Sequence, residues 1–176
     1  GDSTGGIGFI SDLEKNKDFY IKDKRILILG AGGASKGIIP SIFLKKPSSI
    51  KIYNRTYENA KKVIEKFSIL GDISILDKEN IEKNKFDLVI NATSQGMSSE
   101  NFEVPEGIFE KGSICYDLSY GPAAKNFMNY AKENQLIFYD GLGMLIEQAA
   151  ESFFIWEGIR PNVTKRLYEK LLAVTN

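Results

Sequence analysis

The sequence predicts an α/β protein with a Rossmann-like, doubly wound and mainly parallel six-stranded sheet, helices on both faces, and two further helices at the C-terminal end. Three observations predict this class. Short apolar runs alternate with longer amphipathic segments, a glycine-rich turn joins one run to a helix, and the runs are nearly continuous in apolar character. The 176 residues suffice for one sizeable domain with a hydrophobic core.

The strands are predicted by runs rich in Ile, Leu, Val, Tyr and Phe that end in turn residues. These runs are 25–30, 49–54, 72–76, 86–91, 113–118 and 136–140. Because strands alternate with helices, right-handed crossovers should make the sheet parallel. Such sheets bind ligands beyond the carboxyl ends of their strands, near the point where the strand order reverses.

The helices are predicted where apolar residues recur at helical spacing. They are 33–45, 56–67, 122–134 and a short segment at 78–84, followed by 143–158 and 163–175. The last two helices have no strand between them, and they end the alternating pattern.

Composition and charge exclude several classes of protein and site. The 23 basic side chains equal the 23 acidic ones, so there is no electrostatic case for nucleic acid or an anionic membrane surface. No apolar stretch approaches the roughly 20 residues that span a bilayer and no signal-peptide pattern opens the chain, so we expect a soluble, cytoplasmic protein. Histidine is absent, and the single cysteine, Cys115, excludes an internal disulfide and a cysteine-rich metal site. We therefore expect no metal, and a buried, inert thiol rather than a reactive one.

A glycine turn follows the first predicted strand and precedes a helix. Gly30, Gly32 and Gly33 would let the backbone turn tightly and let a pyrophosphate approach without a Cβ in the way. Free amides at the helix start favour an anion. Ser35 stands where the third glycine of a G-x-G-x-x-G pattern would fall. We interpret the turn as a dinucleotide-binding loop, with a purely structural turn as the alternative.

The end of the second strand indicates which dinucleotide is bound. Sheets that prefer NAD carry an Asp or Glu there, about 20 residues after the glycine turn. This strand instead ends in Asn54, Arg55 and Thr56. A guanidinium and a hydroxyl suit a phosphate group, which favours the 2′-phosphate of NADP. In the alternative interpretation, Arg55 is a solvated surface residue and Thr56 only caps the next helix.

A third loop follows the fourth strand and should lie at the same edge of the sheet. Its small or polar residues Asn91, Ala92, Thr93 and Ser94 would line the ribose and nicotinamide of the cofactor. Taken alone, this composition is common in loops.

Five strings resemble, in order and spacing, the shikimate dehydrogenase family: GAGGASKG, NRT, NATSQGM, YDLSYGP and DGLGMLIEQAAESFFIWEG. The resemblance covers essentially the whole chain. In that family a substrate lobe precedes an NADP-binding lobe, and the enzyme uses NADPH to reduce 3-dehydroshikimate to shikimate in aromatic amino acid biosynthesis. The resemblance implies a hinge or connecting helix at 1–15, an NADP-binding Rossmann domain at 16–160, and a C-terminal helix at 161–176 that packs toward the substrate lobe.

The resemblance also implies roles for individual residues. The pyrophosphate would be wrapped by Gly30, Ala31, Gly32, Gly33 and Ala34, and the 2′-phosphate held by Asn54, Arg55 and Thr56. The nicotinamide would lie beside Leu118 and Gly141, and the substrate would contact Tyr120 and Gln148. Two alternatives stay open: Tyr120 as an aromatic at the edge of the core, and Gln148 as a buried amide bonded to a backbone carbonyl.

The first residues depart from the family pattern G-x-N-T-D-G-x-G-F, because they read GDSTGGIGF. Ser3 replaces the asparagine, and Gly5 replaces the aspartate that in the family binds substrate and works with a first-lobe lysine in proton transfer. We therefore expect no catalytic residue in this chain and little or no turnover by it alone. It would be a fragment of a longer enzyme, a stand-alone NADP-binding domain, or a degenerate paralogue.

Two other functions stay open beside the reduction of 3-dehydroshikimate. One is a non-catalytic nucleotide-binding module that assembles with a partner, and the other is an NADP oxidoreductase acting on quinate-like substrates. The last two helices carry large apolar residues, among them Phe153, Phe154, Trp156 and Leu167. Part of that surface would pack on the first lobe, and its exposure would favour self-association, for example as a homodimer.

Overall fold

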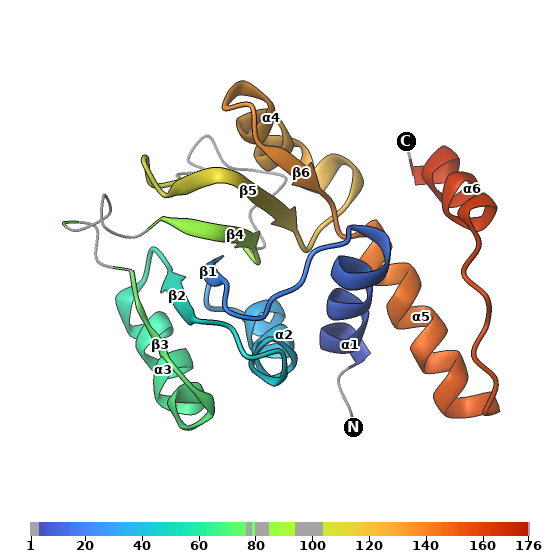
Figure 1. Cartoon of the computed structure of the whole chain (residues 1–176), viewed down its shortest axis with the longest axis horizontal. Coiled ribbons are helices and arrows are strands. Elements are labelled where there is room, and N and C mark those ends of the chain that lie inside the picture. Colours follow the sequence, from blue (N-terminus) through green and yellow to red (C-terminus); the bar gives the residue numbers. More distant parts are fainter. Residues whose placement is uncertain (1–3, 77–78, 80–84, 94–103, 176) are drawn as a thin grey trace.

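A parallel sheet of six strands forms the centre of the computed structural model, which describes residues 4–76, 79, 85–93 and 104–175 (Figure 1). The strands are β1 (Arg25–Leu29), β2 (Ser49–Tyr53), β3 (Ile73–Ile75), β4 (Phe86–Asn91), β5 (Phe109–Asp117) and β6 (Ile137–Tyr139). Their order is β3-β2-β1-β4-β5-β6, and all neighbours are parallel. The predicted doubly wound sheet is confirmed, and its strand order reverses between β1 and β4.

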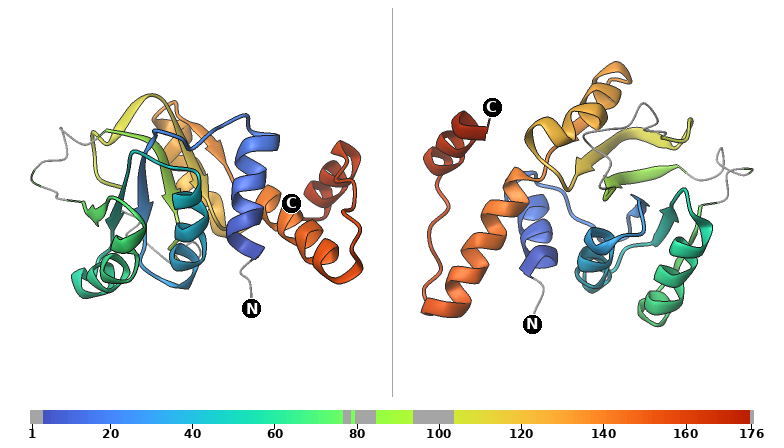
Figure 2. Two further views of the ribbon diagram at one scale, coloured as in Figure 1. Left: turned by 60° about the horizontal axis from the view of Figure 1, so that its bottom comes forward. Right: turned by 180° about the vertical axis from the view of Figure 1, so that it is seen from behind.

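The helices cover both faces of this sheet and extend beyond one side of it (Figures 1 and 2). They are α1 (Thr4–Ser11), α2 (Gly33–Leu44), α3 (Tyr57–Phe67), α4 (Lys125–Glu133), α5 (Leu142–Glu157) and α6 (Lys165–Thr175). A π-helical turn (Asp12–Asn16) and two 3₁₀ turns (Ser68–Leu70 and Gly121–Ala124) continue or precede them. The helix predicted at 78–84 lies outside the described residues, apart from residue 79.

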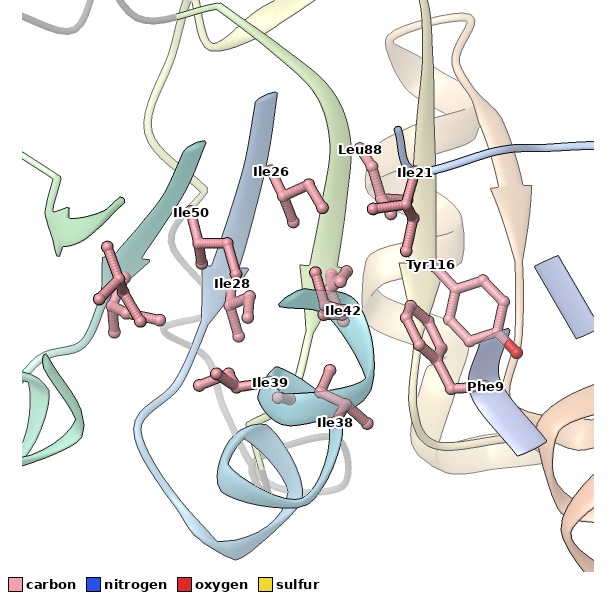
Figure 3. Packing of buried hydrophobic residues seen from close by; sticks show 14 of the residues in the cluster. Phe9, Ile21, Ile26, Ile28, Ile38, Ile39, Ile42, Ile50, Leu88 and Tyr116 are labelled. Carbon is pink, nitrogen blue, oxygen red and sulfur yellow. The ribbon is translucent and has the colours of Figure 1, made fainter. Parts of the chain in front are cut away.

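Alternate side chains of the central strands enter two separate hydrophobic clusters. Ile26 and Ile28 of β1 pack with α1, α2 and α3 on one face, as Figure 3 shows for part of that cluster. Leu27 and Leu29 pack on the other face, against Phe127 of α4 and its neighbours. Full burial of one such side chain contributes roughly 1.5–3 kcal/mol, which explains why both faces of these strands are apolar in sequence.

Helix α1 forms although Gly5 and Gly6 each cost about 1 kcal/mol relative to alanine in a helix. A Cβ on Gly6 would lie 2.9 Å from the carbonyl oxygen of Gly37 in α2. A Cβ on Gly8 would lie 2.7 Å from the carbonyl oxygen of Met144 in α5. The glycines therefore allow α1 to pack closely between two helices, and this packing offsets their low helix propensity.

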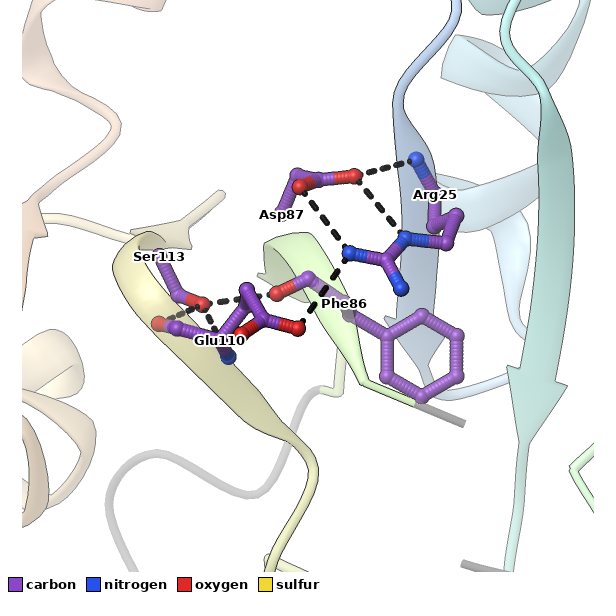
Figure 4. Close-up of polar contacts among 5 residues, drawn as sticks. All are labelled: Arg25, Phe86, Asp87, Glu110 and Ser113. Atoms are coloured by element: carbon purple, nitrogen blue, oxygen red, sulfur yellow. Dashed lines mark hydrogen bonds and ion pairs between the residues drawn. The ribbon is translucent and has the colours of Figure 1, made fainter. Parts of the chain in front are cut away.

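The amino ends of three strands are joined by polar contacts (Figure 4). The backbone N–H of Arg25 donates to Asp87 Oδ2 at 2.7 Å, and its guanidinium contacts both Asp87 and Glu110. Burial alone would raise the pKa of Asp87, but hydrogen bonds from Arg25 outweigh this effect and lower it. The Ser113 hydroxyl donates to the carbonyl oxygen of Phe86 at 2.7 Å. These contacts tie together β1, β4 and β5, and they lie at the edge opposite to the predicted ligand site.

The C-terminal helices lie beyond α1 on the side away from α2 (Figures 1 and 2). The Lys17 ammonium lies over the rings of Tyr139 and Tyr168, at 4.8 and 5.4 Å from their centroids, which links α6 to the body of the domain. Phe153, Phe154, Trp156 and Leu167 are all exposed. None of the helices in the described ranges has the length and apolar character needed to cross a membrane.

Candidate functional site

The residues with predicted cofactor roles lie at or beyond the carboxyl ends of five strands. The chain leaves β1 at residue 30, β2 at residue 54, β4 at residue 92, β5 at residue 118 and β6 at residue 140. Two of these strands, β1 and β4, flank the reversal of strand order. Since parallel strands end at the same edge, this arrangement brings the predicted loops together at the position where such sheets bind ligands.

Gly30 is required by the backbone itself. Its φ of 104° lies in a region that side chains with a Cβ rarely adopt. A Cβ there would also lie 3.0 Å from the carbonyl oxygen of Ala92. The Gly30 N–H donates to the carbonyl oxygen of Tyr53 at 2.7 Å, so this amide is already used within the protein.

Gly32 and Gly33 face open space instead. No described atom lies within 4 Å of a Cβ built on either residue. Gly32 caps the start of α2, where the first N–H groups have no partner within the helix. Amides at a helix start, together with the helix dipole, favour an anion, so this geometry is compatible with the predicted role of the turn. The buried Ser35 hydroxyl donates to the Gly32 carbonyl oxygen at 2.9 Å and fastens this turn.

Asn54 joins the loop after β1 to the loop after β2. Its Oδ1 accepts the N–H of Ala31 at 3.1 Å, and its Nδ2 donates to the carbonyl oxygen of Thr56 at 2.8 Å. The amide of Ala31 is therefore occupied by Asn54 in this structure. Both loops are held at a fixed spacing, and Asn54 acts on the site by positioning them.

Arg55 and Thr56 are exposed at the tip of this second loop. The Arg55 guanidinium has no hydrogen bond or ion pair with any residue that the structure describes. Thr56 stands at the N-cap of α3, but its hydroxyl makes no capping hydrogen bond. Both side chains are thus accessible to a ligand, and the interpretation that Thr56 only caps a helix finds no support in this geometry.

Hydrogen bonds of a buried asparagine fix the start of the loop after β4. Asn91 is 3% exposed, and its Nδ2 donates to Asp117 Oδ2 at 2.8 Å. Its Oδ1 accepts the Thr93 N–H at 3.1 Å and the Thr93 hydroxyl at 2.7 Å. Ala92 is also buried. Ser94 lies outside the described residues. Of the other three predicted residues of this loop, only the half-buried Thr93 presents a side chain toward the surface.

Asp117 was not among the predicted site residues, although the string YDLSYGP contains it. Its side chain is fully buried at the end of β5. One oxygen accepts from Asn91 and the other accepts the Ser119 N–H at 2.8 Å. Burial raises the pKa of Asp117 to about 6, although hydrogen bonds from Asn91 and Ser119 act in the opposite direction. A carboxylate that ends a strand buried on both faces was the available signal in the sequence.

The residues predicted beside the nicotinamide lie where β5 and β6 end. Gly141 donates its N–H to the carbonyl oxygen of Ser119 at 2.8 Å, and a Cβ on Gly141 would overlap the carbonyl oxygen of Leu118. Leu118 is half-buried against the core. The two segments therefore approach so closely that only glycine fits at position 141.

The residues predicted at the substrate are less closely grouped. Tyr120 is 40% exposed at the end of the loop after β5. Gln148 is half-buried on α5, beside Gly8 of α1, and its side chain has no hydrogen bond to a described residue. Gly5 lies on α1 as well, and it contributes no side chain. The structure thus places Gln148 where α1 and α5 meet, and Gly5 elsewhere on α1.

Two further features limit the chemistry of the site. Cys115 is fully buried, and burial raises the pKa of its thiol to about 12, which makes it an unreactive core residue. In the described parts of the chain, no group of three or more Cys, Asp or Glu side chains is arranged to hold a metal ion.

Known proteins of one family match nearly the whole chain. Residues 12–114 match the family model for shikimate / quinate 5-dehydrogenase, and residues 141–166 match the model for the shikimate 5′-dehydrogenase C-terminal domain. The chain is 42% identical to a shikimate dehydrogenase (NADP(+)) of Dechloromonas aromatica over 98% of its own length and 65% of that protein. It therefore spans slightly less than two thirds of the length of this relative.

Solved structures of related enzymes are also similar to this chain, in both sequence and fold. An Ael1 enzyme from Pseudomonas putida is 34% identical, with a TM-score of 0.85 over 96% of this chain and 62% of that one. A shikimate dehydrogenase solved in complex with NADP+ is 30% identical, with a TM-score of 0.74 over 98% of this chain and 62% of that one. Both similarities extend over nearly the whole of this chain.

Proposed function

Because the chain belongs to the shikimate dehydrogenase family, we propose that it binds NADP(H) at the carboxyl edge of its sheet as the cofactor-binding part of an NADP-dependent shikimate dehydrogenase. One of the similar enzymes carries NADP(+) in its name, and another was solved in complex with NADP+. One observation of this structure carries the proposal. The guanidinium of Arg55, which pairs with no residue in the described parts of the chain, stands on a loop that Asn54 ties to the open amino end of α2.

The chemistry of these two positions fits the cofactor. Free amides at the start of α2 bind one anion, and Gly32 leaves room for it because it has no Cβ. Arg55 and the Thr56 hydroxyl then bind the second anionic group, the 2′-phosphate. The absence of a carboxylate at this loop removes the usual partner of unphosphorylated ribose hydroxyls. The site therefore favours NADP over NAD.

The other predicted residues position the reacting groups. When bound, NADPH supplies a hydride to a carbonyl carbon, and the protein contributes orientation and exclusion of water. Leu118 and Gly141 lie at the strand ends where the nicotinamide would rest, and Thr93 presents its hydroxyl to the ribose. Tyr120 and Gln148 are proposed to contact the substrate, 3-dehydroshikimate or shikimate. These assignments are supported by the location of the residues at the sheet edge and on α5.

We propose in addition that this chain alone turns over poorly. The reduction of a carbonyl needs a proton as well as a hydride, and Gly5 offers no carboxylate at the position of the family aspartate. Mixing the chain with NADP+ and shikimate and following NADPH absorbance tests this point. Reduction at the rate of a full-length enzyme would contradict it.

Equilibrium titration of the chain with NADPH and with NADH tests the proposed cofactor. Fluorescence of the reduced nicotinamide reports binding of both ligands under identical conditions. The proposal predicts clearly tighter binding of NADPH. Equal affinity for the two would remove the assignment of the 2′-phosphate to Arg55, and failure to bind either would overturn the proposed function.

Two observations favour alternatives that deserve a test. The matching family model covers quinate as well as shikimate dehydrogenases, so a quinate-like substrate is the second candidate. Parallel assays with shikimate and quinate on a full-length enzyme containing this chain distinguish the two. The exposed apolar side chains of α5 and α6, such as Trp156 at 80% exposure, favour self-association as a homodimer. A clean monomer by sedimentation at high concentration would contradict the homodimer.

A further inference from the structure

We propose that Asp117 is a positioning residue for the cofactor site: its buried carboxylate holds the loop after β4 and the loop after β5 in the single arrangement that binds the cofactor. This inference rests on the proposed function. It assigns a role to a residue that touches neither the cofactor nor the substrate. Asp117 acts through Asn91 and Thr93 on one side and through Ser119 on the other.

The contacts form one continuous chain of hydrogen bonds across two strands. Asn91 and Asp117 are the last residues of β4 and β5, and they are paired in the sheet register. Asp117 accepts from Asn91 with one oxygen and from the Ser119 N–H with the other, both at 2.8 Å. Asn91 in turn accepts twice from Thr93. The Leu118 N–H donates to the Asn91 carbonyl oxygen at 2.9 Å, which adds a backbone link between the same two segments.

The direction of every bond in this chain is fixed by residue 117. A carboxylate accepts on both oxygens, so it can receive Asn91 and Ser119 at the same time. Because Asn91 donates to Asp117 with Nδ2, its Oδ1 is free to accept from Thr93. If residue 117 presented a donor to Asn91, two N–H groups would face each other. Asn91 could avoid this only by turning its amide, and its Nδ2 would then face the Thr93 N–H.

The direction of these hydrogen bonds determines whether Thr93 can donate to a ligand or accept from it. Its hydroxyl hydrogen points inward to Asn91 Oδ1, so the oxygen lone pairs stay available on the half-buried side chain. Thr93 can therefore accept a hydrogen bond from a ribose hydroxyl. Ser119, held by the other Asp117 oxygen, precedes Tyr120 and accepts the Gly141 N–H through its carbonyl oxygen. One buried carboxylate thus fixes segments that approach the cofactor from two sides.

The surroundings of Asp117 disfavour the charged form of its carboxylate. Burial raises the pKa of Asp117 to about 6, and the charge of Asp140, in the connection between β6 and α5, acts in the same direction. The groups that lower it are Asn91 and Ser119. At pH 8 the carboxylate is ionised and the chain of bonds is intact. Below pH 6 the protonated oxygen places its hydrogen opposite one N–H donor, so one of the two hydrogen bonds is lost and the loops are held less firmly, although protonation also removes the cost of burying the charge.

The test compares the wild-type chain with Asp117→Asn, which preserves shape but introduces a donor. NADP+ affinity is measured by calorimetry at pH 8 and pH 5. At pH 8 the variant should bind about tenfold more weakly, the effect of losing roughly one hydrogen bond. At pH 5 the two proteins should bind alike. The 2′-phosphate itself titrates near pH 6, but the ratio of the two affinities at one pH cancels that effect.

Asp87→Asn is the matched control. Asp87 also joins neighbouring strands through hydrogen bonds, but at the opposite edge of the sheet. This variant should lose stability and keep the wild-type affinity for NADP+ at both pH values. A role for Asp117 in stability alone predicts the same behaviour for both variants, so equal NADP+ affinity of Asp117→Asn and wild type at pH 8 would overturn the inference.

The wild-type chain provides a second measurement that needs no variant to fold. In NMR spectra recorded between pH 4.5 and 8, the amide signals of Thr93 and Ser119 should shift with one common midpoint. The Asp117 carboxyl carbon should share this midpoint. Separate midpoints would contradict the inference even if NADP+ binds as proposed, whereas a wild-type chain that does not bind NADP+ at pH 8 would overturn the proposed function itself.

Discussion

Replacing Gly32 with alanine separates the two uses of glycine in the loop after β1. Gly32 has φ −88° and ψ −162°, extended backbone that alanine adopts without strain. No described atom lies within 4 Å of the new Cβ. The substitution should therefore stabilise the chain by about 0.4–1 kcal/mol, because alanine lowers the conformational entropy of the unfolded state.

Gly30→Ala should have the opposite effect on stability. Its φ of 104° costs a residue with a Cβ about 1–2 kcal/mol, and the new methyl would lie 3.0 Å from the backbone oxygen of Ala92. In urea denaturation, the free energy of unfolding should therefore be higher than wild type for Gly32→Ala and lower than wild type for Gly30→Ala. This comparison depends only on the fold and not on the cofactor.

Gly32→Ala should weaken cofactor binding although it raises the stability of the chain. The new methyl would enter the space before the amino end of α2, where the pyrophosphate is proposed to lie. We expect NADP+ to bind at least tenfold more weakly, which corresponds to about 1.4 kcal/mol. If Gly32→Ala is more stable but binds NADP+ as tightly as the wild type, the pyrophosphate does not occupy this space.

Three further predictions concern packing, reactivity and pH. Gly143→Ala places a Cβ against the carboxylate of Asp12, so urea denaturation should show a loss of about 1–3 kcal/mol, and unchanged stability would contradict the packing. The Cys115 thiol, with a pKa of about 12, should react with a thiol reagent at pH 8 only after unfolding; rapid labelling of the native chain would show that it is not buried. The pKa of Asp117 rises from 3.8 to about 6 on folding, so its contribution to stability is complete below about pH 4 and is lost as the pH rises through 6. Relative to Asp117→Asn, the wild type should gain on the order of 3 kcal/mol of stability as the pH falls over this range, and a constant difference in urea denaturation would contradict the shift.

The fold followed from features that the sequence carries locally. Strands buried on both faces need apolar residues at successive positions, and Ile26 to Leu29 show this directly. The limits of strands were harder to predict. β5 begins at Phe109, four residues before the predicted start, because Gly112 adopts a positive φ within the strand and the Ser113 hydroxyl bonds to Phe86 and Glu110. A glycine that reads as a turn in sequence is here part of an irregular strand.

The candidate site was predictable in its location but not in its hydrogen bonds. The exposed positions of Gly32 and Arg55 followed from their place after β1 and β2. Asn54 and Asn91 are predicted to contact the cofactor, and this stays a prediction; in the structure the half-buried Asn54 and the buried Asn91 bond to neighbouring segments, as polar side chains removed from water require. The role of Asp117 depends on the register between β4 and β5, which pairs it with Asn91. No local pattern in the sequence specifies that register.

The preference for NADP+ over NAD+, compared between the wild type and Arg55→Ala, tests the role of Arg55 in cofactor binding most directly. A hydrogen-bonded charged pair contributes about 1.5–3 kcal/mol, so the substitution should weaken NADP+ binding roughly 10- to 150-fold and leave NAD+ binding unchanged. Arg166→Ala, at an exposed arginine on α6, is the control and should change neither affinity. If Arg55→Ala keeps the wild-type preference for NADP+, the arginine does not bind the 2′-phosphate and the cofactor assignment of this site is contradicted.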